Sequence, residues 1–183
     1  RTQGRHSDAD VPGDAVGIFM PMVPEAAIAL LAIGYVGGVA VPAFSGYGPD
    51  ALAMRLHDAN AKVLLTADGV HRRAKPVPMK TVADEALRAS PSVTSVLVFR
   101  RAGLDVPMQP GRDRDWGEAV AAATPLSTYV RTLANDPYLL LYTSGSTGKP
   151  KGARHVHAGF PLKNMIDQYL LFDVKPGERM LWF

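Results

Sequence analysis

Short apolar runs alternate with helical segments along the first third of the chain. The runs at 14–20, 39–44 and 62–66 are bounded by turn residues, which is typical of buried strands. The segments between them, 25–35 and 50–59, are predicted as helices, and each has a proline at its start, where a helix tolerates one. Strand, helix, strand, helix, strand at this spacing predicts right-handed crossovers, a parallel sheet with flanking helices and therefore an α/β fold.

The rest of the chain continues this mixture of strands and helices. The helix at 25–35 has apolar residues on every face, so we expect it to be buried. The further elements are expected, in order, as a basic loop after 66, a helix at 82–89, a strand-rich run at 93–99, an exposed loop at 103–114, a helix near 116–123 and a strand at 138–143.

Composition supports a folded chain and excludes several kinds of site. Of the 183 residues, 47% are hydrophobic and 20% are charged, so the chain can bury a core. It contains no cysteine, which excludes disulfide bonds, a thiol nucleophile and a thiolate metal site. The longest apolar run, 26–41, is shorter than a membrane span and contains a Gly-Gly pair, so we expect no membrane insertion. A cytoplasmic location is the default expectation.

Positive charge is concentrated in two windows that lack acidic residues. The windows 69–83 and 137–166 hold eight of the 20 basic residues, although the net charge of the chain is only +3. Crowded cations repel one another unless an anion screens them, so the windows indicate phosphate-bearing ligands, with two solvated loops as the alternative. Nucleic acid is not an expected partner, because no aromatic residue lies among these arginines and the rest of the chain is net acidic.

The most informative segment is Tyr142-Thr-Ser-Gly-Ser-Thr-Gly-Lys-Pro-Lys-Gly152, which directly follows an apolar strand. Glycines free backbone N–H groups, hydroxyls donate hydrogen bonds and lysines neutralise charge, which together suit a polyphosphate. The segment is not the common P-loop, because only two residues separate Gly145 from Gly148 and Pro150 follows Lys149. A Ser/Gly surface linker is the alternative, but it does not explain the position directly after a strand.

This segment, with His155 after it, resembles the phosphate-binding signature of the adenylate-forming (AMP-binding) superfamily: acyl-CoA synthetases, luciferases and the adenylation domains of peptide synthetases. The resemblance extends over nearly the whole chain and narrows toward acetyl-CoA and related short-chain acyl-CoA synthetases. The other stretches that carry it are Met20-Pro-Met-Val-Pro-Glu25, Phe44-Ser-Gly-Tyr-Gly-Pro-Asp50, Thr66-Ala-Asp68, Pro78-Met-Lys80 and Pro91-Ser-Val93.

The resemblance implies a two-step ligase. A small carboxylate, with acetate or propionate preferred, attacks the α-phosphate of Mg-ATP to give acyl-AMP and pyrophosphate, and the CoA thiol then displaces AMP. The residues implied to hold the ATP phosphates are Thr143, Ser144, Gly145, Ser146, Thr147, Gly148, Lys149 and Lys151. An Arg-rich turn after the third strand is implied to contact the 3′-phosphate end of CoA, and the residues in that place are Arg72, Arg73, Ala74 and Lys75. A tethered pantetheine arm lacks this phosphate, so the cluster favours a CoA synthetase over a peptide-synthetase domain.

The resemblance also implies a fragment. In this superfamily the adenine loop, the ribose-binding Asp, the magnesium carboxylate, the hinge and the catalytic Lys follow the phosphate loop. We therefore expect no catalytic residue and no metal ligand in this chain, and no activity from the chain alone. Residues 1–134 are expected to form an incomplete α/β subdomain of the adenylation domain, and 135–183 the phosphate-loop segment and the start of the next subdomain. A truncated, non-catalytic nucleotide- or phosphate-binding module is the alternative.

Two parts of the sequence depart from the superfamily pattern: Arg154 replaces an apolar residue, and Arg73-Ala74 occupies the usually Gly-rich CoA turn. His155 and His157 are expected to be structural, because an ionised carboxylate needs no general base. A set of apolar and aromatic side chains is expected to pack in the core or against a neighbouring subdomain rather than to line an acyl pocket: Phe19, Met20, Met22, Phe44 and Tyr47.

Overall fold

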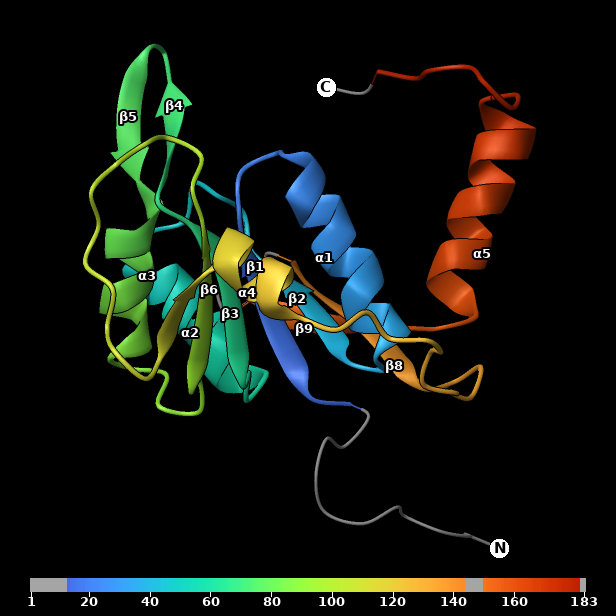
Figure 1. Cartoon of the computed structure of the whole chain (residues 1–183). Helices are drawn as coiled ribbons and strands as arrows, with labels where there is room; N and C mark the ends of the chain where they lie inside the picture. The colour runs from blue at the N-terminus through green and yellow to red at the C-terminus, as the bar shows by residue number, and fades with distance from the viewer. Residues whose placement is uncertain (1–12, 144–149, 182–183) are drawn as a thin grey trace, which may run out of the picture.

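A computed structural model describes residues 13–143 and 150–181 of the chain. Within these residues, one seven-stranded sheet has the order β7-β6-β3-β1-β2-β8-β9, and its strands are parallel except for β9, which runs antiparallel to β8 (Figure 1). The predicted α/β fold is confirmed. The strands are β1 (Ala15–Phe19), β2 (Val39–Pro42), β3 (Val63–Ala67), β6 (Ser95–Phe99), β7 (Asp113–Asp115), β8 (Pro137–Thr143) and β9 (Lys151–Val156).

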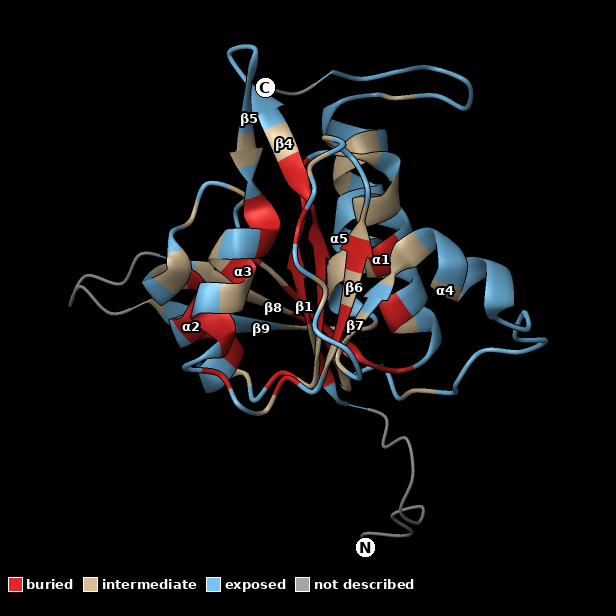
Figure 2. Ribbon diagram, turned by 60° about the vertical axis from the view of Figure 1, so that its left-hand side comes forward, coloured by how far each residue is buried: buried red, intermediate tan, exposed pale blue. Residues whose placement is uncertain are grey.

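Helices cover both faces of this sheet, as expected for parallel strands joined by crossovers (Figures 1 and 2). On one face, α2 and α3 pack their buried Leu52, Leu56 and Met79 against the strands. On the other face, α1 contributes Ala29 and Ile33, while α4 and α5 contribute partly buried aromatic side chains. The helices are α1 (Pro24–Tyr35), α2 (Pro49–Asp58), α3 (Met79–Leu87), α4 (Trp116–Ala122) and α5 (Gly159–Ile166), which continues into a π-helical segment, Asp167–Leu171.

Three expectations about local structure are wrong. Helix α1 buries only Ala29 and Ile33, because one face meets the sheet while the opposite face, with Leu31 at 69% exposure, stays open. The basic segment after β3 is not a loop: it forms the antiparallel hairpin β4 (Gly69–Arg72) and β5 (Lys75–Pro78), and α3 begins directly after it. The segment 103–114 is not wholly a loop, because its last residues join the sheet as β7.

The aromatic and methionine side chains divide between interior and surface. Phe19 and Met20 are buried as expected, whereas Met22 is fully exposed and Phe44 is 61% exposed. Within the described residues, no helix combines the length and the apolar character that are needed to cross a bilayer.

The parallel arrangement brings several connections to one edge of the sheet. The strands β1, β2, β3, β6 and β8 all run in the same direction, so their carboxyl ends meet at that edge. The turn at 44–47, the β4–β5 hairpin, the segment 100–104 and Thr143 therefore lie along this carboxyl edge. Open α/β sheets bind their ligands there, because the connections at that edge vary without disturbing the core.

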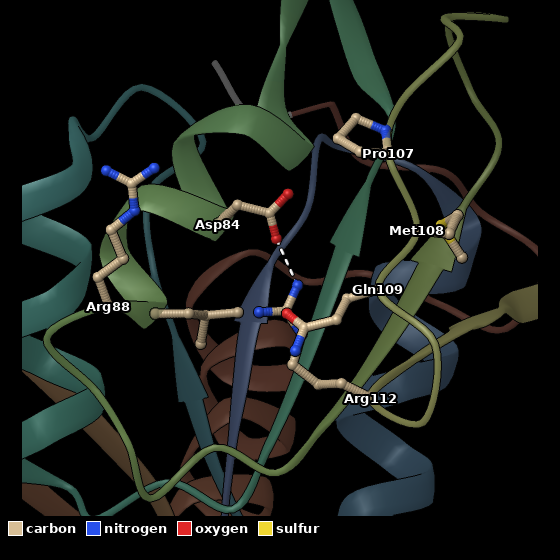
Figure 3. A pocket seen from close by; sticks show the side chains of 7 residues that line it. Asp84, Arg88, Pro107, Met108, Gln109 and Arg112 are labelled. Carbon is tan, nitrogen blue, oxygen red and sulfur yellow. Dashed lines mark hydrogen bonds and ion pairs between the residues drawn. The ribbon is translucent and has the colours of Figure 1, made fainter.

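A buried ionic cluster explains one of the four cations of the first basic window. Lys80 is only 1% exposed, and its Nζ lies 2.7 Å from Asp84 Oδ2 and 2.8 Å from Asp113 Oδ2. Arg112 reaches the same two carboxylates, at 2.6 Å from Asp84 and 2.5 Å from Asp113. Figure 3 shows the Asp84–Arg112 contact in a pocket of about 460 Å³ between α3 and the segment that leads to β7. Lys80 therefore ties that segment to α3, and the interpretation of all four cations as phosphate-facing is wrong for Lys80.

Stability should depend on the ionisation of Asp113 at acid pH. Burial by itself would raise the pKa of Asp113, but hydrogen bonds from Arg112, Lys80 and the Gln109 N–H outweigh it and lower the pKa from 3.8 to about 2. Because the folded-state pKa lies below the unfolded value, the stabilisation is complete above about pH 4 and is lost as the pH falls toward 2. Asp113→Asn should therefore lower the free energy of unfolding at pH 7 by roughly 2 kcal/mol.

Urea unfolding of both proteins between pH 7 and pH 2.5 measures this difference. The gap between wild type and Asp113→Asn should narrow as the pH falls through that acid range. Asp105→Asn is the matched control, because Asp105 is an exposed carboxylate in the same segment. A gap that stays constant down to pH 2.5 would contradict the assignment.

Candidate functional site

The predicted CoA contacts come together at the tip of the β4–β5 hairpin. Arg72 and Lys75 are paired residues of the two strands, and Arg73 and Ala74 form the two-residue turn between them. Both turn residues have left-handed backbone, with φ of 49° and 63°. Positive φ at both central residues is a favoured geometry for two-residue hairpin turns, because it matches the twist of the flanking strands. All four residues are exposed, so the hairpin presents three cations to solvent at the carboxyl edge of the sheet.

The base of this hairpin is fixed by the carboxylate of Asp68. Asp68 is fully buried between β3 and β4, and its Oδ1 accepts hydrogen bonds from the N–H groups of Gly69, Arg101 and Ala102 at 2.7 to 2.9 Å. Its Oδ2 accepts from the Leu104 N–H at 3.0 Å. Burial favours a higher pKa for Asp68, but these four backbone hydrogen bonds together lower the pKa below its ordinary value, so the group is ionised at neutral pH.

The hairpin also contacts the turn that follows β2. Arg72 Nη2 lies 3.4 Å from Ser45 Oγ, and the Arg72 guanidinium lies 5.6 Å from the centre of the Phe44 ring. The Phe44 ring meets Tyr47 edge to face at 5.7 Å. These contacts direct one of the predicted CoA-contacting cations toward the 44–47 turn.

The two ends of the predicted phosphate loop lie side by side. Thr143, the last residue of β8, is the register partner of Lys151, the first residue of β9, and both are exposed at the carboxyl edge. The antiparallel pair β8–β9 therefore forms the stem from which the loop extends. The other predicted phosphate contacts, Ser144, Gly145, Ser146, Thr147, Gly148 and Lys149, lie outside the described residues.

Sequence reasoning missed two groups of residues that support these elements. The first is Asp68, whose position directly after a buried strand and before a glycine is the signal that identifies it. The second group consists of Arg55 and Asp58 of α2 with Tyr47 and Tyr142, which meet at the end of β8. The spacing of apolar and charged residues along the segment 50–59 does not indicate that Arg55 and Asp58 contact aromatic side chains outside this helix.

The histidines near the loop pack against aromatic rings. His155 lies 5.4 Å from the Phe160 ring, and His157 lies 5.1 Å from the Tyr138 ring. Among the residues the structure describes, no group of three or more His, Asp and Glu side chains is arranged to hold a metal ion.

Removal of the Asp68 carboxylate should destabilise the base of the hairpin. Asp68→Ala leaves four N–H groups without their acceptor, and the expected loss is at least about 2 kcal/mol of unfolding free energy, because hydrogen bonds to charged groups contribute more than neutral ones. Asp68→Asn keeps one carbonyl oxygen and should lose less. Chemical denaturation of the three proteins at pH 7 gives the order, and equal stability of Asp68→Ala and wild type would contradict the role of the carboxylate.

Comparison with known proteins places this geometry in a family. The family model described as "AMP-binding enzyme" matches residues 11–183. The acetyl-coenzyme A synthetase of Mycobacterium tuberculosis is 45% identical over 174 residues, which are 94% of this chain and 27% of that protein. The acetyl-coenzyme A synthetase of Novosphingobium aromaticivorans is 43% identical over 166 residues, 91% of this chain and 26% of that protein.

A solved structure of the acetoacetyl-CoA synthetase from Streptomyces lividans superimposes with a TM-score of 0.85 at 30% identity, covering 94% of this chain and 26% of that one. The chain thus spans about a quarter of the length of the relatives it matches. The predicted resemblance is confirmed over nearly the whole described fold: the chain belongs to the family of AMP-binding enzymes.

Proposed function

We propose that this chain is part of an AMP-forming acid–thiol ligase that activates a short-chain carboxylate with ATP and transfers the acyl group to CoA. The observation that carries the proposal is the arrangement at the carboxyl edge, where the stem of a Ser/Thr/Gly/Lys loop and a cationic hairpin lie along one side of a parallel sheet. The 45% identity to an acetyl-coenzyme A synthetase supports acetate or a similar small acid as the substrate.

In the first half-reaction, a carboxylate oxygen forms a bond to the α-phosphorus of ATP, and the bond from that phosphorus to the bridging oxygen of the β-phosphate breaks. Pyrophosphate leaves with the bond electrons, and no proton moves because the carboxylate is already ionised. The loop residues Thr143 to Lys149 would donate hydrogen bonds to the phosphate oxygens, and Lys149 and Lys151 would neutralise the charge that accumulates on pyrophosphate. Magnesium would add to this neutralisation, with ligands outside the described residues.

In the second half-reaction, the CoA thiol loses its proton to solvent and its sulfur forms a bond to the acyl carbon, while the bond from that carbon to the phosphate oxygen of AMP breaks and AMP leaves with the bond electrons. The proposed part of this chain is recognition rather than bond making. Arg72, Arg73 and Lys75, with Ala74 completing the turn, would bind the 3′-phosphate of CoA, and the exposure of all three cations at the hairpin tip supports this role. Residues that touch the reacting atoms would lie in the remaining length of the protein, so the chain by itself should not turn over.

ATP–pyrophosphate exchange that depends on acetate or propionate tests the first half-reaction in the complete protein. Lys149→Ala should lower the exchange rate by about 100-fold, the size of effect seen when one charge-stabilising donor is removed from an active site. Lys62→Ala is the matched control, because Lys62 precedes β3 at the opposite edge of the sheet. Wild-type protein without any exchange would favour the non-catalytic phosphate-binding module instead.

The CoA contact is tested by comparing CoA with dephospho-CoA, which lacks only the 3′-phosphate. The triple variant Arg72→Ala, Arg73→Ala, Lys75→Ala should raise the KM for CoA by roughly ten-fold or more, since charge-assisted bonds to phosphate are lost, and should leave exchange unchanged. Wild type should prefer CoA, whereas the triple variant should use the two thiols alike. Arg88→Ala removes an exposed arginine from the end of α3 and serves as the control. A triple variant that still prefers CoA would exclude the hairpin as the phosphate contact.

A further inference from the structure

Arg55 of α2 is a buried cation whose contacts are mainly aromatic. Its residue is 6% exposed, and its Nη1 donates to the Ala51 carbonyl at 2.5 Å. Among the ion pairs of the described residues, none involves Arg55. Its guanidinium instead lies 4.0 Å from the centre of the Tyr47 ring and 5.7 Å from the centre of the Tyr142 ring. A desolvated guanidinium is attracted to aromatic faces, so Arg55 holds the two rings in place.

Tyr142 is held by a second residue of the same helix. Its hydroxyl donates a hydrogen bond to Asp58 Oδ2, and Asp58 is the last residue of α2, about one turn after Arg55. Burial is the larger cause and the hydrogen bond to Asp58 the smaller cause of a raised pKa for the Tyr142 phenol, so the hydroxyl is protonated and can donate at neutral pH. The ring and the hydroxyl of Tyr142 are thus both attached to α2.

The partner strand leaves space for the Tyr142 ring. Gly152 is the register partner of Tyr142 on β9. A Cβ at Gly152 would lie 3.0 Å from Leu140 Cδ1 and 3.3 Å from Tyr142 Cε1, both closer than ordinary van der Waals contact. Because Gly152 has no side chain, the Tyr142 ring can occupy its place between the β8–β9 pair and α2.

The end of β8 depends on this anchor because its support from the sheet is limited. The ladder between β2 and β8 pairs Ala40 with Leu139, whereas the pairs of β9 with β8 continue to Thr143. Strand β9 is the edge of the sheet, so it has no further strand behind it among the described residues. Tyr142, which packs with Leu140 against the α2 and α3 side of the core, thus connects the last part of β8 to the helical layer.

We propose that Arg55 and Asp58 are positioning residues for the first half-reaction, which act through Tyr142 to hold the end of β8 and, with it, Thr143, the proposed phosphate contact at that end. This inference rests on the proposed function of the phosphate-binding residues. Neither residue touches a phosphate in this proposal. Their effect is geometric, because a displacement of about 1 Å in a residue that positions substrate is enough to lower the rate strongly.

The test uses the complete protein and separates the two half-reactions. ATP–pyrophosphate exchange measures the first, and thioester formation from preformed acyl-adenylate and CoA measures the second. Tyr142→Phe keeps the ring and loses the hydroxyl, and Asp58→Ala loses the acceptor. Each should lower kcat/KM for ATP in exchange by about ten-fold, in part through a higher KM, and should leave the second half-reaction within about two-fold of wild type.

Conservative variants and a matched control test whether the acceptor at position 58 and the cation at position 55 are the groups that matter. Asp58→Asn keeps an acceptor oxygen and should recover most of the exchange activity, and Arg55→Lys should retain more of it than Arg55→Leu. Asp50→Ala removes an exposed carboxylate from the first turn of the same helix and should behave as wild type. The double variant Asp58→Ala, Tyr142→Phe should be no worse than the poorer single variant, because both changes break the same bond.

The possible outcomes distinguish a failure of the proposed function from a failure of this inference. Wild-type protein without exchange overturns the proposed function, and this inference with it. Normal exchange in wild type, Asp58→Ala and Tyr142→Phe overturns the inference alone. Equal losses in both half-reactions together with a lower Tm indicate a role in stability only and also overturn it. If Asp58→Ala does not fold, Tyr142→Phe decides the question, because it keeps the packing of the ring.

Discussion

Asp68 joins three parts of the carboxyl edge through its buried carboxylate and its main-chain groups. It accepts the N–H groups of the segment after β6 and of the first residue of β4, while its own carbonyl accepts from the start of α3 and its N–H donates to the end of β6. An ionised group is tolerated in this position because oriented backbone dipoles replace the water it loses. The hairpin, the segment 100–104 and the first turn of α3 therefore take their relative positions from this one residue, through its carboxylate and its main-chain groups.

The two proposed binding regions share a structural support. The 44–47 turn meets the hairpin through Phe44 and Ser45, and it meets α2 through Tyr47, which stacks on Arg55. Arg55 in turn lies near Tyr142 at the start of the phosphate loop. The regions assigned to CoA phosphate and to ATP phosphate are thus connected through packed side chains over a short path. An enzyme with two sequential half-reactions at one edge needs such fixed relative positions, because both substrates must reach the same acyl group.

The sequence predicted the sheet well because buried parallel strands are short, apolar and bounded by turn residues, and β1, β2 and β3 have this pattern. It could not predict β7, whose Asp-Arg-Asp sequence has no apolar face, or the hairpin, whose Arg73-Ala74 turn lacks the usual glycine. Lys80 has the same sequence context as the exposed cations, because its partners Asp84 and Asp113 both lie outside the acid-free window 69–83. The outer face of α1 was misjudged because a helix that is apolar all round has the same pattern whether one face or both are covered.

The hairpin also has an electrostatic consequence for ligand affinity. Arg72 and Lys75 are directly opposite one another on a two-stranded ribbon that is separate from the main sheet, so folding brings two like charges to within neighbouring distance. This repulsion raises the free energy of the folded protein before any ligand binds. In the proposed CoA contact, the 3′-phosphate dianion would relieve that repulsion in addition to forming its own contacts, so part of the binding free energy would come from removing a repulsion that is already present in the free protein. Dissolved salt screens the same repulsion, and the hairpin should therefore become more ordered, yet bind anions less tightly, as ionic strength rises.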